Sequence, residues 1–232
     1  MKVTLLTHTP EPEKIVAAAA RCCYSNDDPD KLLDNMTDEK AAKFLQKLND
    51  LGHQSPIEHV SFTFAISGVS RALLAQITRH RLASFSVRSQ RYCGFNSSDF
   101  VKPPVLEDSE VEAIFDGALD QCKYSYDILI DSGIPKEDAR MLLPNASATS
   151  MVVTMNAREL LHFFSLRCCT RAQWEIRNLA NEMVKLVKKV APNLFSKAGA
   201  ACIQLGYCPE GQFSCGRAPS IDKLLEAFKS KG

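Results

Sequence analysis

Residues 60–92 read VSFTFAISGVSRALLAQITRHRLASFSVRSQRY, and this stretch predicts a strand, a helix and an arginine-rich segment in succession. Its first ten residues are rich in β-branched and aromatic side chains, which predicts a core strand over 60–69. Residues 70–78 have a helical pattern. The arginine-rich segment 79–92 therefore begins at the C-terminal end of a helix and continues in an extended form.

Four arginines and one histidine lie within residues 79–92, although the formal net charge of the whole chain is only +1. Guanidinium groups are planar, permanently charged and bidentate, so several in one place suit a phosphate or a carboxylate. A histidine between two arginines, His80, should be disfavoured as imidazolium. The alternative is a surface helix end, where arginines are favoured by the helix dipole.

The composition excludes several classes of protein. The 28 Lys and Arg balance 27 Asp and Glu, so no global field would hold a nucleic acid or an anionic membrane. No run approaches the roughly 18 apolar residues of a membrane span, and the N-terminus lacks a signal-peptide pattern, so we expect a cytoplasmic protein. Nine cysteines, including the adjacent pairs Cys22–Cys23 and Cys168–Cys169, fit reduced thiols that act as small hydrophobes.

The remaining pattern predicts one α+β domain over residues 1–232, without repeats or linkers. Strands are expected over 1–8 and 147–155, a polar turn over 26–30 and a loop over 93–106. Helices are expected over 11–24, 37–51, 107–131, 134–144, 156–166, 172–190, 193–204 and 220–229.

Two further segments carry polar residues with possible chemistry. His53, Ser55, Glu58 and His59 have residue types that bind metals, but their spacing lacks a fixed zinc geometry; the alternative is a polar loop with a buried, hydrogen-bonded His59. In the helix over 156–166, Arg158 and His162 are four residues apart and share a face.

Together these segments resemble the flavin-dependent thymidylate synthases. The family hallmark, Arg-His-Arg followed after seven residues by Ser, is present as Arg79-His80-Arg81 and Ser89, and it continues as Gln90-Arg91-Tyr92. Residues 53–59 with Phe62-Thr63-Phe64 are similar to the upstream block. Asn156-Ala157-Arg158, Leu166-Arg167 and residues 172–176 are similar to the downstream block. The resemblance covers about residues 53–190.

The resemblance implies conversion of dUMP to dTMP, with 5,10-methylenetetrahydrofolate as the carbon donor and NADPH as the reductant through FAD. It also implies an α+β fold with a mixed or antiparallel sheet flanked by helices, and a homotetramer with shared active sites. The dUMP-binding residues that it implies are Gln76, Ile77, Thr78, Arg79, Val87, Arg88, Ser89, Gln90, Arg91, Arg140 and Arg167.

The resemblance also implies a flavin site. FAD would contact His53, Ser55, Arg79, His80, Arg81, Val87, Asn156, Ala157, Arg158 and His162. Positively charged side chains beside the flavin ring would stabilise the anionic reduced flavin that delivers hydride. Arg167 matches the catalytic arginine of the family, which contacts uracil and favours its N3-ionised form.

Several positions constrain these roles. Ser89 has no histidine–carboxylate relay in its vicinity in the sequence, so we expect it to hold dUMP rather than act as a nucleophile. The resemblance assigns no nucleophilic role to any cysteine, including Cys93 near the motif. Ser86, Val87 and His162 depart from frequent forms of the motif, and Val87 can contact a ligand only through its backbone or apolar surface. Cys202, Cys208 and Cys215 have the wrong spacing for a paired CxxC site, which favours structural thiols over a three-thiolate site.

Two other functions use the same residues. A non-redox nucleotide or phosphate sensor would need only the arginines. A metal hydrolase would be built on His53, Glu58 and His59.

Overall fold

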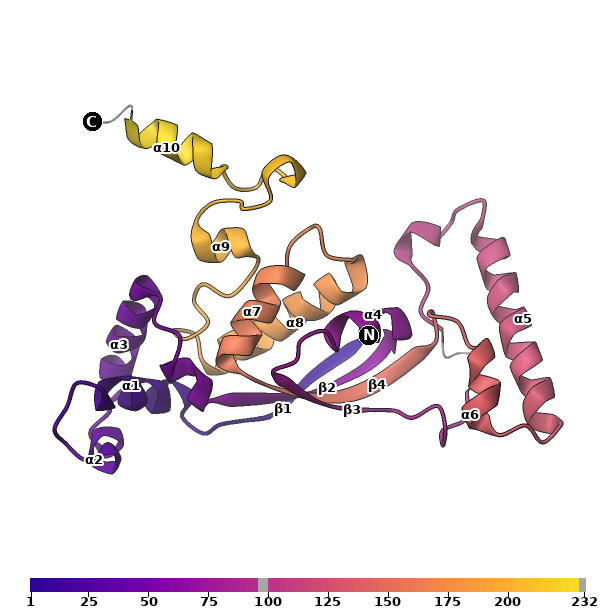
Figure 1. Ribbon diagram of the computed structural model, residues 1–232, viewed down its shortest axis with the longest axis horizontal. Helices are drawn as coiled ribbons and strands as arrows, with labels where there is room; N and C mark the ends of the chain where they lie inside the picture. Colours follow the sequence, from indigo (N-terminus) through magenta and orange to yellow (C-terminus); the bar gives the residue numbers. More distant parts are fainter. Residues whose placement is uncertain (96–99, 230–232) are drawn as a thin grey trace. The chain divides into compact units, whose positions relative to one another are not determined.

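The computed structural model describes residues 1–95 and 100–229, and the chain forms two compact units within it (Figure 1). Unit 1 contains Met1–Lys2, Ala65–Arg79 and Phe85–Val153; unit 2 contains Val3–Phe64, His80–Ser84 and Thr154–Gly232. Four residues of the predicted loop over 93–106, numbers 96–99, lie outside the described part of the chain.

The sheet has four antiparallel strands in the order β1-β2-β4-β3, which confirms the predicted α+β class. The strands are β1 (Lys2–His8), β2 (Ser61–Ser70), β3 (Ala83–Val87) and β4 (Ala148–Asn156). The unit boundaries fall within the strands, so each unit contains part of the sheet. The prediction of a mixed or antiparallel sheet is thereby narrowed to an antiparallel one.

The central strands bury every second side chain. In β2, Phe62, Phe64 and Ile66 are at most 1 % exposed, while the intervening residues are half-buried. In β4, Met151 and Val153 are buried in the same alternating manner. This period of two places one face of each strand in the core, and it confirms the strands predicted over 60–69 and 147–155.

Helix α4 (Arg71–Ile77) and strand β3 follow β2 as the sequence predicts. The Ser70 hydroxyl accepts a hydrogen bond from the backbone N–H of Leu73, so Ser70 is the N-cap of α4. The helix ends just before the arginine-rich segment. Strand β3 contains Ser84 and Ser86 of that segment, so the predicted extended form is confirmed for residues 83–87, while residues 90–92 form a turn.

Three helices of unit 2 precede β2: α1 (Pro12–Cys22), α2 (Pro29–Asp34) and α3 (Asp38–Leu51), with the short 3-10 helix η1 (Pro56–His59) after them. The predicted caps of α3 are confirmed: Thr37 accepts from the N–H of Lys40, and Gly52 takes the left-handed φ of 69° that ends the helix. Helices α2 and α3 and the η1 segment all pack against α1.

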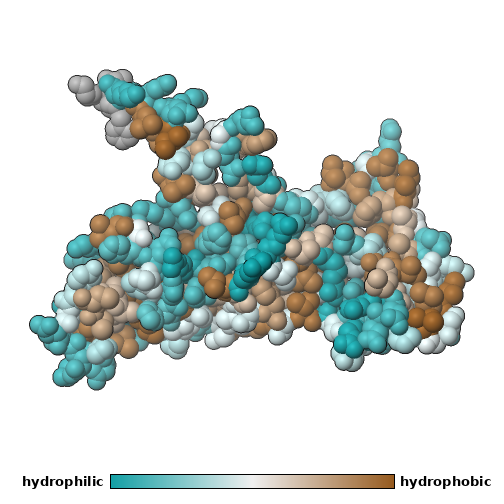
Figure 2. Space-filling model, in the orientation of Figure 1, coloured by the Kyte–Doolittle hydropathy of each residue, from teal (hydrophilic) through white to brown (hydrophobic). Residues whose placement is uncertain are grey.

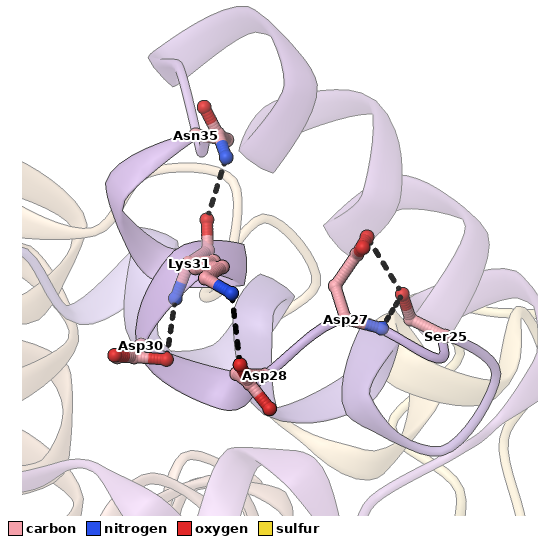
Figure 3. Close-up of polar contacts among 6 residues, drawn as sticks. All are labelled: Ser25, Asp27, Asp28, Asp30, Lys31 and Asn35. Atoms are coloured by element: carbon pink, nitrogen blue, oxygen red, sulfur yellow. Dashed lines mark hydrogen bonds and ion pairs between the residues drawn. The ribbon is translucent and has the colours of Figure 1, made fainter.

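Helix α2 lies partly in the segment predicted as a polar turn over 26–30. Its first residue is Pro29, which suits a first helical turn. Figure 3 shows the polar contacts that surround it: Lys31 pairs with Asp28 at 2.9 Å, its N–H donates to Asp30, and Asn35 donates to the Lys31 carbonyl at the other end. The turn prediction missed that an Asp-Pro pair also starts a helix.

Unit 1 carries η2 (Pro104–Leu106), α5 (Glu112–Asp131), α6 (Lys136–Ala139) and η3 (Arg140–Leu142). Helix α5 begins five residues after the predicted start at Glu107. The reason is that Asp108 has a φ of 58°, which an α-helix does not allow, and its N–H is bonded by the Glu112 carboxylate. Phe95 and Tyr126 pack together with the fully buried Ala139 and fix α5 and α6 to one another.

The C-terminal part of unit 2 contains α7 (Ala157–Arg167), α8 (Trp174–Val190), α9 (Ala201–Leu205), η4 (Gly211–Phe213) and α10 (Ile221–Lys229). The helix predicted over 193–204 is wrong for most of its length, because residues 193–197 form turns and Gly199 has a φ of 153°. Phe163, Phe164 and Phe195 are fully buried and form the core beneath α7. Within the described residues, no helix is both long and apolar enough to cross a membrane.

Candidate active site

Three arginines converge in unit 1, and one of them was not predicted as a site residue. The Arg71 Nη2 group donates to the backbone carbonyl of Arg88 at 2.9 Å. Burial lowers the pKa of the Arg71 guanidinium, and the positive charges of Arg140 and Arg88 lower it further. Arg88 and Arg140 are therefore both close enough to repel Arg71, and no ion pair in the described part of the chain neutralises these three cations.

The Arg71 side chain also leaves one donor unused. Its Nε atom is buried and has no hydrogen-bond partner among the described residues. A buried donor without a partner costs about 1–3 kcal/mol, so such an atom marks a place where a missing acceptor fits. The sequence held a signal for this residue: Arg71 is the one charged side chain in the predicted helix 70–78.

Another arginine of unit 1, Arg91, pairs with a carboxylate of the same unit. Arg91 Nη2 lies 2.7 Å from Glu137 Oε2, and Arg91 Nε donates to the same oxygen at 2.8 Å. Arg140 Nε donates to the backbone carbonyl of Glu137 at 3.0 Å. Glu137 was also missed in the sequence, and it links the predicted dUMP residues Arg91 and Arg140.

The other predicted dUMP residues of unit 1 flank these arginines along the chain. Ile77 is fully buried, so it can offer a ligand only its backbone. Thr78 and Arg79 are exposed at the end of α4, and the Thr78 hydroxyl donates to the Leu74 carbonyl. The remaining four are all half-buried: Gln76 in α4, Val87 at the end of β3, and Ser89 and Gln90 after it.

In unit 2, one buried imidazole lies between a carboxylate and a guanidinium. His80 Nδ1 is 2.8 Å from Glu159 Oε1, and Arg167 Nε donates to His80 Nε2 at 3.2 Å. His80 is 4 % exposed and Glu159 is 5 % exposed. Burial lowers the pKa of His80 below its usual 6.5, and Arg167 and His162 add to the lowering, while Glu159 opposes it.

The lowered pKa of His80 agrees with the expectation that its imidazolium form is disfavoured, but the main cause of the lowering is different. From the sequence, the flanking arginines of the motif were expected to lower the pKa of His80, whereas burial is the dominant cause in the structure. Glu159 is the partner that the sequence argument missed. Its position, three residues after the N-cap of α7, was the only available signal.

The predicted flavin residues around α7 make capping, backbone, ion-pair and ring contacts within unit 2. The Asn156 side chain caps the helix by accepting from the N–H of Glu159 at 2.9 Å. Ala157 is fully buried, and its N–H donates to the Val60 carbonyl. Arg158 is half-exposed and pairs with Glu58. His162 is exposed, and its ring meets that of His80 edge-on at 5.7 Å.

The upstream polar segment does not form the metal site considered from the sequence. His53, Ser55, Glu58 and His59 are all exposed, and His59 is therefore not the buried histidine of the alternative interpretation. Over residues 1–95 and 100–229, the ligand atoms of His80, Glu159 and His162 form the one group within 4.8 Å of each other. The Glu58 carboxylate is instead occupied by Arg158.

The nine cysteines are free thiols, and five of them line one small hollow of about 30 Å³ in unit 2. These are Cys168, Cys169, Cys202, Cys208 and Cys215. Burial raises the pKa of Cys168 to about 12, whereas a hydrogen bond with the Thr170 side chain lowers the pKa of Cys215. Cys22 and Cys23 are exposed, so they are not buried hydrophobes as expected.

Comparison with known proteins places this arrangement in a family. Residues 4–193 match the family model described as thymidylate synthase complementing protein. The flavin-dependent thymidylate synthase of Geobacter sulfurreducens is 50 % identical over 228 residues, covering 97 % of this chain and 98 % of that protein. That of Clostridium tetani is 48 % identical over 241 residues, covering 97 % and 96 %.

A solved structure supports the same assignment. The UMP/dUMP methylase PolB from Streptomyces cacaoi, bound with 5-Br dUMP, superposes with a TM-score of 0.76 at 26 % identity, covering 85 % of this chain and 95 % of that chain. The family match and these relatives span most of the chain, including every segment that carried the motifs. The chain therefore belongs to the flavin-dependent thymidylate synthase family.

Proposed function

We propose that this protein is a flavin-dependent thymidylate synthase, which methylates dUMP to dTMP with 5,10-methylenetetrahydrofolate as the carbon donor and NADPH as the reductant. The observation that carries the proposal is the cluster of unneutralised arginines in unit 1, with the buried, unpartnered Nε of Arg71. Family membership supplies the reaction. The cluster supplies a site for the phosphate of its substrate.

The dUMP phosphate is held by Arg71, Arg88 and Arg140. A phosphate carries up to two negative charges at neutral pH, and it would offset the repulsion from Arg140 and Arg88 that adds to burial in lowering the pKa of Arg71. It would also offer an acceptor to the orphan Nε. Ser89 and Arg91 follow β3 and add a hydroxyl and a second guanidinium fork, so that Glu137 and the phosphate compete for Arg91.

The described residues of unit 2 fit an anionic flavin cofactor. Arg81 and Arg158 are exposed cations, His162 is an exposed hydrogen-bonding ring, and Ser55 offers a hydroxyl. These donors suit the pyrophosphate and adenosine portions of FAD. When bound, FAD would supply the hydride that reduces the transferred methylene to a methyl group.

The residues of the chain then prepare the uracil ring. The Arg167 guanidinium favours the ionised N3 of uracil because a nearby cation stabilises the anion. The neutral His80 accepts from Arg167 and adds no second positive charge beside it. We assign no cysteine as a nucleophile on uracil, and Ser89 binds dUMP.

We propose one functional domain over residues 1–232 that assembles as a cytoplasmic homotetramer. Large apolar side chains support the assembly because several are strongly exposed on unit 1, as the brown areas over α5 in Figure 2 show. Of the large apolar side chains of unit 1, Ile114 in α5 is 72 % exposed and Met141 in η3 is 84 % exposed. Light scattering coupled to size-exclusion chromatography should give a mass of about four chains.

The purified protein tests the reaction directly. We expect flavin absorbance in the visible range, NADPH oxidation that depends on dUMP and folate, and release of tritium from [5-³H]dUMP. Arg91→Ala should weaken dUMP binding, whereas Arg167→Ala should chiefly reduce kcat. A protein that binds dUMP but cannot be loaded with FAD and releases no tritium would instead be a non-redox nucleotide sensor.

A further inference from the structure

Three side chains of unit 2 form a chain of hydrogen bonds that the family assignment does not explain. Glu159 Oε1 lies 2.8 Å from His80 Nδ1, and His80 Nε2 lies 3.2 Å from Arg167 Nε. Two of the three, Glu159 and His80, are almost completely buried. The imidazole therefore connects a hidden carboxylate to the half-buried arginine that we assign to the uracil ring.

The donors and acceptors allow one arrangement of protons. A guanidinium has only donors, so His80 Nε2 must be the unprotonated acceptor. A carboxylate has only acceptors, so His80 Nδ1 must carry the proton. The ring is thus neutral and fixed as the Nδ1–H tautomer, an assignment that follows from its two partners.

We propose that Glu159 and His80 are positioning residues: Glu159 holds His80 in the Nδ1–H tautomer, and His80 in turn orients the Arg167 guanidinium for its contact with uracil. This inference rests on the proposed function, since it takes Arg167 as the group that acts on the substrate. It assigns a role to a residue, Glu159, that lies outside the family motif as the sequence shows it.

The packing of the ring supports a fixed orientation. The His80 ring meets the fully buried Phe163 edge-on, with 5.0 Å between the ring centroids and an angle of 77°. The His162 ring also meets the His80 ring edge-on, with 5.7 Å between the centroids and an angle of 61°. A long arginine side chain has many rotamers, so a bond to an immobile acceptor reduces the entropy that it would lose on binding substrate.

The same atoms also argue against a metal ion at this place. The ligand atoms of Glu159, His80 and His162 lie within 4.8 Å of one another, as a metal site would require. However, the Nε2 lone pair accepts from the positively charged Arg167, and Nδ1 bonds Glu159. A cation would have to break one of these bonds beside an existing positive charge.

Loss of Glu159 should act through the tautomer. Without the carboxylate, His80 can place its proton on Nε2, where it faces an N–H of Arg167 instead of accepting from it. Losing one hydrogen bond to a charged group costs about 1.5–3 kcal/mol, so kcat should fall roughly ten- to hundredfold. The KM for dUMP should change less, because the phosphate is held by the arginines of unit 1.

The test compares two substitutions of Glu159 in the FAD-loaded full-length enzyme. Glu159→Gln keeps an acceptor for Nδ1–H, and it should keep the tautomer and a kcat within a few-fold of the parent. Glu159→Leu removes the acceptor and should lose both. Glu13→Gln changes another half-buried carboxylate of unit 2, one that accepts from Asn193, and serves as the control with unchanged kcat.

The tautomer is read independently of activity by solid-state ¹⁵N NMR of ¹⁵N-histidine-labelled enzyme, with the His80 signal assigned by its loss in His80→Gln. A parent enzyme with His80 as Nε2–H or as imidazolium at pH 7.5 would overturn the proposal without any Glu159 variant. Equal kcat in Glu159→Gln and Glu159→Leu would overturn it as well. If the parent formed no dTMP, the proposed function would be wrong, and the NMR measurement would still show whether His80 is the Nδ1–H tautomer.

Discussion

Arg71 gives the sharpest test of the phosphate site, because replacing it should affect the ligand-free and the dUMP-bound protein differently. We consider Arg71→Met, which keeps most of the aliphatic stem and removes the charge. The substitution removes the Nη2 bond to the Arg88 carbonyl and also removes a cation that Arg88 and Arg140 repel. In the ligand-free protein these two changes oppose each other.

The expected magnitudes follow from these contacts. One lost hydrogen bond costs about 0.5–1.5 kcal/mol, and relief of the repulsion offsets part of it, so the Tm without ligand should change by less than about 4 °C. A lost contact to a phosphate costs about 1.5–3 kcal/mol, which weakens dUMP binding roughly ten- to hundredfold. At a dUMP concentration of a hundred times the parent Kd, dUMP should raise the free energy of unfolding of the parent by about 2.7 kcal/mol and that of Arg71→Met by about 1.4 kcal/mol or less.

Calorimetric titration with dUMP and with deoxyuridine measures the effect directly. Deoxyuridine lacks the phosphate, so its affinity should be the same in Arg71→Met and in the parent. Arg21→Met, at an exposed arginine of unit 2, is the matched control and should leave both affinities unchanged. If Arg71→Met bound dUMP as tightly as the parent, or lost deoxyuridine and dUMP equally, Arg71 would not be a phosphate ligand.

Three further predictions concern other side chains. Glu137→Gln should tighten dUMP binding by up to about fivefold in the same titration, because the half-exposed carboxylate no longer competes for Arg91; weaker binding would contradict this competition. Alkylation with iodoacetamide at pH 8, followed by peptide mass spectrometry, should label Cys215 early and Cys168 last. The reason is that the pKa of Cys215 is lowered and that of Cys168 is raised to about 12. Labelling of Cys168 before Cys215 would contradict this prediction. Because the pKa of His80 is below 6.5 in the folded protein, its contribution to stability is complete above pH 6.5 and is lost as the pH falls from 6.5 through the folded-state pKa. The Tm of His80→Gln should therefore fall less than that of the parent between pH 7 and 5. If the Tm of both proteins fell equally over this range, His80 would not be a buried neutral ring.

Much of the secondary structure was predictable because its causes are local. The alternation of β2, the Thr37 and Gly52 caps of α3 and the extended form of β3 each depend on a few neighbouring residues. The errors arose where one backbone angle overrides the side-chain pattern. Asp108 at a φ of 58° delays α5, and Gly199 at 153° accompanies the turns that replace a predicted helix.

The candidate site was predictable to the extent that its residues lie in motifs. The segment 79–92 identified Arg79, Arg81, Arg88 and Arg91 but not Arg71, and the order of the blocks identified the family. Glu137 and Glu159 lie in no motif, yet they are bonded to Arg91 and His80 across 46 and 79 positions of sequence. Sequence spacing carries no information on such pairs, because the fold brings them together.

The sequence by itself determined the α+β class, the family and the types of side chain available for binding phosphate and flavin. Only the tertiary structure decided which charged groups lie close together: Arg88 and Arg140 repel Arg71, whose Nε has no partner among the described residues, and the buried Glu159 carboxylate bonds Nδ1 of His80. The physical reason is that helices and strands follow from local periodicity and caps, whereas burial and hydrogen-bond partners depend on segments far apart in the chain.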